Sequence, residues 1–122
     1  MDDHLMVALI LVAILVAVDL VSGFAAAWAT KNVQSSKLRE GLWHKAGYAF
    51  VISAAMACEW GAANGLELGF EVPLVIPTCV WICFMEIVSI LENAKKMNPE
   101  LKNVPGFEKL NKDNEEDKEE EQ

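Results

Sequence analysis

The sequence predicts an all-α membrane protein with three transmembrane helices and a short disordered acidic C-terminal tail. The chain has 122 residues, 53% of them hydrophobic, which is too apolar for an ordinary soluble domain of this size. The apolar residues come in three blocks separated by polar stretches, and a helix needs about 20 residues to cross the hydrocarbon. No block alternates with period two, and one short chain could not close a barrel, so strands are not expected.

The first predicted span covers residues 5–29 and follows an outer flank, residues 1–4. It opens with fourteen uncharged residues, Leu5 to Val18. A signal peptide is the competing interpretation, but Asp2 and Asp3 occupy the place where such peptides carry positive charge.

The second and third predicted spans cover residues 46–66 and 72–91. Pro77 lies inside the third pattern and should kink the helix or delay its first turn. The remaining segments are a basic loop at 30–45, an outer turn at 67–71 and a charged tail at 92–122.

The charged tail is not expected to form a core. A short amphipathic turn from Phe107 to Leu110 is expected, and no fixed fold after about Asn111. Acidic residues dominate the last ten positions, Asp113 to Gln122, which therefore indicate a solvated segment.

The distribution of basic residues predicts the orientation. The loop at 30–45 carries four of the ten basic residues and the tail carries the other six, whereas the first flank and the outer turn carry none. The positive-inside rule then places the N-terminus outside and the C-terminus inside. The main alternative is two spans with one segment lying at the interface.

Each predicted span carries one carboxylate, Asp19, Glu59 or Glu86. An Asp at the centre of a membrane helix costs roughly 2.5 kcal/mol or more, so each acid should face another helix, water or a partner charge. Asp19 and Glu86 both fall in the inner half of the membrane, and Lys45 enters the second span from that side. Lys45 is therefore expected to pair with Asp19 or Glu86 within one chain or between chains, either as structural helix packing or as part of a pore.

Glu59 lies nearer the outer side, with no basic residue at its level. It is expected to face water, to accept hydrogen bonds from a partner, or to stay protonated. Because intramembrane ionisable groups usually mark a pathway or a partner, a functional role is favoured over a structural one.

Small residues form one face of the first predicted helix. They are Ser22, Gly23, Ala26 and Ala27. Their spacing allows close helix approach, and Asp19 lies on the same face. This face therefore indicates a helix contact rather than lipid exposure.

The remaining reactive side chains indicate neither a cofactor nor a metal. Cys58, Cys79 and Cys83 lie in apolar segments, where a thiol packs as a small hydrophobe. His4 and His44 lie at other depths, so no metal-ligand set is formed. No catalytic set or phosphate-binding glycine loop is present in the sequence, so enzyme activity is not expected. The acidic balance also argues against nucleic acid as a partner.

Two stretches of the chain resemble a known family. One is Val18-Asp19-Leu20-Val21-Ser22-Gly23, followed by Ser36 and Gly41-Leu42-Trp43-His44-Lys45; the other is Glu86-Ile87-Val88-Ser89-Ile90-Leu91-Glu92-Asn93. Over roughly residues 15 to 101 they are similar to phage holins of the toxin-secretion/phage-lysis type. The matched positions are Asp19, Gly23, Ser36, Gly41, Lys45, Glu86, Ser89, Glu92 and Asn93.

This resemblance implies a small multi-pass protein of the bacterial cytoplasmic membrane. Such holins accumulate in the lipid bilayer, form homo-oligomers, and open pores or lesions that release an endolysin or a toxin. The alternative is a non-conducting membrane adaptor or accessory subunit that docks a partner through its C-terminal tail.

Overall fold

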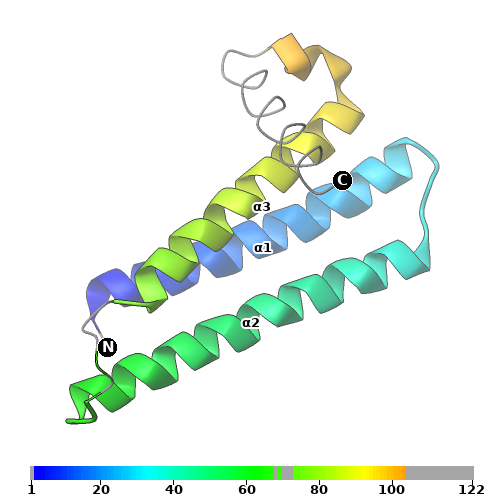
Figure 1. Cartoon of the computed structure of the whole chain (residues 1–122). Helices are drawn as coiled ribbons and strands as arrows, with labels where there is room; N and C mark the ends of the chain where they lie inside the picture. Colours follow the sequence, from blue (N-terminus) through cyan, green and yellow to red (C-terminus); the bar gives the residue numbers. More distant parts are fainter. Residues whose placement is uncertain (1, 68, 70–72, 104–122) are drawn as a thin grey trace, which may run out of the picture.

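The computed structural model describes residues 2–67, 69 and 73–103, and it is all-helical over this part of the chain (Figure 1). The elements are α1 (Asp3–Ala29), α2 (Ser35–Ala63), α3 (Val75–Met97) and the short 3₁₀ helix η1 (Pro99–Asn103). The all-helical prediction is therefore confirmed over these residues. The turn expected at Phe107–Leu110 and the tail expected after Asn111 lie outside them.

Helices α1 and α3 lie side by side and run in the same direction. Helix α2, which lies between them in the chain, runs in the opposite direction (Figure 1). The most extensive packing is between α1 and α3, whereas α2 makes fewer contacts with either. One apolar cluster joins the three helices. Its buried members are Val12, Ile52, Ala55, Val75, Cys79, Ile82 and Cys83. The two buried thiols thus pack among apolar side chains, while Cys58 is exposed.

The basic stretch at 30–45 is mostly helical rather than a loop. Lys31 takes a left-handed conformation (φ 56°) after α1, and α2 begins at Ser35. The predicted span at 46–66 therefore corresponds to the later part of a longer helix that ends at Ala63. Lys, Leu, Arg and Glu are good helix formers, so the charged first turns of α2 remain helical although they are polar.

Helix α3 is longer than the predicted third span. It begins at Val75, so Pro77 lies in the first turn, where a missing backbone N–H leaves no intrahelical bond unmade. It continues past Leu91 to Met97 through a polar segment. In the turn before it, Gly65 and Gly69 have φ values of 93° and 79°, a conformation that glycine adopts without strain.

Two helices, α1 and α3, are long and apolar enough to cross a membrane. Only 11% of the apolar 18-residue stretch of α1, and 28% of that of α3, is buried inside the protein. Most of their large apolar side chains therefore face outward, as lipid-facing side chains do. Helix α2 does not meet the same criterion, because it includes several polar residues and Glu59. Three membrane-spanning helices therefore stay a prediction.

Candidate functional site

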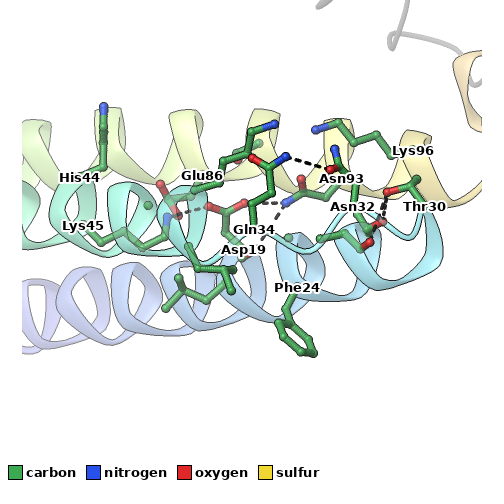
Figure 2. Close-up of a pocket in the computed structure, with 18 of the residues that line it drawn as sticks. Asp19, Phe24, Thr30, Asn32, Gln34, His44, Lys45, Glu86, Asn93 and Lys96 are labelled. Atoms are coloured by element: carbon green, nitrogen blue, oxygen red, sulfur yellow. Dashed lines mark hydrogen bonds and ion pairs between the residues drawn. The ribbon is translucent and has the colours of Figure 1, made fainter.

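A buried ion cluster joins all three long helices (Figure 2). Lys45 of α2 donates through Nζ to Asp19 Oδ2 of α1 at 2.6 Å and to Glu86 Oε2 of α3 at 2.7 Å. Asp19 is 8% exposed and Glu86 is 2% exposed. The three residues that the sequence places at one depth are thus brought together within one chain.

Two carboxylates share one ammonium in this cluster. When both acids are ionised, the cluster carries one excess negative charge. Buried charges of this kind persist only where geometry and additional hydrogen bonds compensate their lost hydration. In the part of the chain that the structure describes, every buried side-chain nitrogen and oxygen has a hydrogen-bond partner.

Asn93 extends the cluster on the side of α3. Its Nδ2 donates to Asp19 Oδ1 at 3.0 Å and to Ser22 Oγ at 3.1 Å, and the Ser22 hydroxyl donates in turn to the Asp19 backbone oxygen at 3.1 Å. In the sequence, only the family motif singles out Asn93, because an asparagine near a helix end has no distinctive pattern. These bonds fix the orientation of the Asp19 carboxylate.

The small-residue face of α1 lies at this contact. A Cβ atom added to Gly23 would lie 3.5 Å from Asn93 Nδ2, an ordinary van der Waals distance. Ala26 is 2% exposed, and Ala27 lines the neighbouring cavity. The absence of larger side chains here lets α1 and α3 approach closely enough for Asn93 to reach Asp19.

Glu59 is separate from the cluster and binds the start of α3. Its Oε1 accepts hydrogen bonds from the backbone N–H groups of Leu74 and, at 3.0 Å, Val75. Leu74, at the N-cap of α3, makes no side-chain capping bond, so Glu59 supplies from α2 the acceptor that this helix start lacks. Of the three roles expected for Glu59, the structure shows the acceptance of hydrogen bonds.

A cavity of about 760 Å³ opens beside the ion cluster, where α1 ends and α2 begins. Among the residues of the family motif, Gly41, Ser89 and Asn93 line it together with the cluster itself. Ser36 and Glu92 are exposed and lie outside its lining. Within residues 2–67, 69 and 73–103, no three His, Cys, Asp or Glu side chains come together to form a metal site.

Replacement of Asn93 by leucine should destabilise the helix packing by about 1–3 kcal/mol, because a buried acceptor on Asp19 loses its donor. Titration of the purified protein with a denaturing detergent, followed by tryptophan fluorescence, measures the loss. Asn98→Leu, a change of the same kind at the C-cap of α3, is the matched control. Equal stability of the Asn93 variant and the parent would show that the bonds to Asp19 contribute nothing.

One of the comparisons with known proteins gives a family match. The model of the bacteriophage holin family matches residues 3–107, which covers all three long helices and every residue of the ion cluster. Neither the curated proteins nor the solved structures gave a match. A holin is a membrane protein of phage lysis, in keeping with the two apolar helices α1 and α3. The chain belongs to the bacteriophage holin family.

Proposed function

We propose that this protein accumulates in the bacterial cytoplasmic membrane, oligomerises, and forms pores or lesions that release an endolysin or a toxin. The observation that supports this most is the buried ion cluster of Lys45, Asp19 and Glu86 between the three long helices. Charged groups at such positions are costly in lipid and usually mark a pathway or a partner.

Three spans with the N-terminus outside are part of the proposal. Contacts between α1 and α3 advance in the same direction along both helices: Asp19 and Glu86 share Lys45, and Ser22 then meets Asn93. If these two parallel helices both cross the membrane, the chain between them must return across it. Helix α2, with 29 residues or about 44 Å of helix, is long enough to do so.

In this mechanism α2 is the helix that moves. Its buried residues are only Ile52 and Ala55, and two polar contacts add to its attachment: Lys45 in its first half and Glu59 near its C-terminal end. Separation of α2 from the α1–α3 pair would expose the ion cluster. In an oligomer, the exposed acids would then line a water-filled lumen rather than face lipid.

Hydration makes such a rearrangement favourable once enough copies are present. An ionised carboxylate is far better stabilised by water than by lipid. The packed monomer buries its charges in the cluster of Lys45, Asp19 and Glu86, so opening depends on neighbouring copies that enclose water together. A threshold in protein density, and thus a defined onset of lysis, follows from this dependence.

Asp19→Asn and Glu86→Gln should each delay the onset of lysis. Either change leaves one carboxylate for one ammonium, which removes the excess charge and favours the packed monomer. Membrane potential and release of a cytoplasmic reporter are followed after expression, at matched amounts of membrane-bound protein. Glu40→Gln changes an exposed acid of α2 and should leave the onset unaltered. An unchanged onset in both cluster variants would refute the proposed role of these acids.

Deletion of residues 111–122 distinguishes a holin from an adaptor that works through its tail. A holin lacking this segment should still permeabilise the membrane with altered timing, whereas an adaptor should lose its function. Reporters of increasing size, released by the full chain, then measure the size of the lesion and the cargo that it admits.

A further inference from the structure

The cavity beside the ion cluster has a positively charged wall that the proposed lesion does not use. Lys37 from the first turn of α2 and Lys96 from the last turn of α3 both line it. Neither lysine forms an ion pair among the described residues. The two acids that also line the cavity are almost fully buried and are bonded to Lys45. The accessible wall is therefore cationic.

Hydrogen-bond donors also line the cavity. The side chains of Asn32 and Gln34, from the connection between α1 and α2, line the cavity (Figure 2). Gln34 occupies the N-cap of α2 without capping it through its side chain, and the first turn of α2 contains no acid. The partial positive charge of this helix start therefore adds to that of the lysines.

Apolar side chains also line the cavity. Leu20 and Phe24 of α1, Leu38 of α2 and Met85 of α3 line the cavity, and Phe24 is partly exposed beside it. Trp28 and Trp43, 71% and 76% exposed, lie near the same ends of α1 and α2, as aromatic side chains do at a membrane–water interface. A ligand for this cavity thus combines a negative group with hydrocarbon.

We propose that the cavity binds the phosphate group of an anionic membrane phospholipid, with Lys37 and Lys96 on the phosphate and the acyl chains along Leu20 and Phe24. A basic pocket between membrane helices is suited to such headgroups. The bound lipid would contact all three helices and so favour the packed monomer. The site does not depend on lesion formation, because binding is measured directly.

The test titrates phosphatidylglycerol into the full-length protein in phosphatidylcholine nanodiscs and counts bound lipid by native mass spectrometry. The Lys37→Gln/Lys96→Gln variant should bind phosphatidylglycerol about thirtyfold more weakly. The Lys31→Gln/Arg39→Gln variant removes the same charge from residues outside the cavity lining and should lose little affinity.

Two results would overturn the proposal. An equal loss in both variants would mean that only general surface charge attracts the lipid. Displacement of phosphatidylglycerol by inorganic phosphate at matched ionic strength would mean that the site holds a free phosphate ion. Retention of the lipid in phosphate, together with selective loss in the Lys37→Gln/Lys96→Gln variant, supports the assignment.

Discussion

Replacement of Lys45 by methionine is expected to lower the stability of the helix packing by about 3–5 kcal/mol, because the change leaves two buried carboxylates without their shared counter-charge. Asp19 and Glu86 each receive a hydrogen bond of 2.6 or 2.7 Å from Lys45. Without it they repel one another in a poorly hydrated site. Titration with a denaturing detergent, followed by tryptophan fluorescence, measures the loss. Lysis should also begin earlier than in the parent at equal amounts of membrane-bound protein.

The triple variant Asp19→Asn/Lys45→Met/Glu86→Gln isolates the electrostatic cause. Neutral groups of similar size avoid the desolvation of charge, so the triple variant should recover most of the lost stability. Arg39→Met is the matched control, since it removes an exposed cation of the same helix that lies outside the cavity lining and should change stability little. A triple variant no more stable than Lys45→Met would show that packing around residue 45, rather than charge, accounts for the loss.

The central site was largely predictable because it follows from depth along helices. Fixed rise per residue and the distribution of basic residues were enough to place Lys45 level with Asp19 and Glu86, and the structure brings these three together. The apolar blocks likewise predicted all three long helices. The predicted helix bounds differ from those of the structure, because hydropathy indicates which residues contact lipid and not where a helix ends. For this reason the helical residues between Ser35 and Lys45 were assigned to a loop.

Contacts that depend on side-chain direction could not be read from the sequence. Asn93 reaches Asp19 only because α1 and α3 are parallel and lie close together at Gly23. The partners of Glu59 are backbone N–H groups. Every residue except proline carries such a group, so the sequence does not indicate which residues Glu59 contacts. One sequence signal points to a contact of this kind: Pro73 and Leu74 precede the start of α3 and neither side chain can cap it, so an acceptor has to come from elsewhere.

Replacement of Glu59 by alanine is expected to lower the free energy of unfolding by about 2–4 kcal/mol, because two part-buried backbone N–H groups lose their acceptor. Glu59→Gln keeps a carbonyl oxygen in place and removes only the attraction between a negative charge and the start of α3, so its loss should be about 1 kcal/mol. The difference between the two variants separates the hydrogen bonds from the charge. Detergent titration with fluorescence detection measures both.

Amide hydrogen exchange identifies which residues lose stability when Glu59 is replaced. In the Glu59→Ala variant, the amides of Val75, Ile76 and Thr78 in the first turn of α3 should exchange faster, while those around Asp19 keep their protection. Glu40→Ala, the same change at an exposed position of α2, should alter neither stability nor exchange. Unchanged exchange at Val75 in the Glu59→Ala variant would mean that the contact is not maintained in the membrane. Faster exchange confined to that turn would instead identify Glu59 as the attachment of α2 to α3, and earlier lysis in the same variant would follow from the weaker hold on α2.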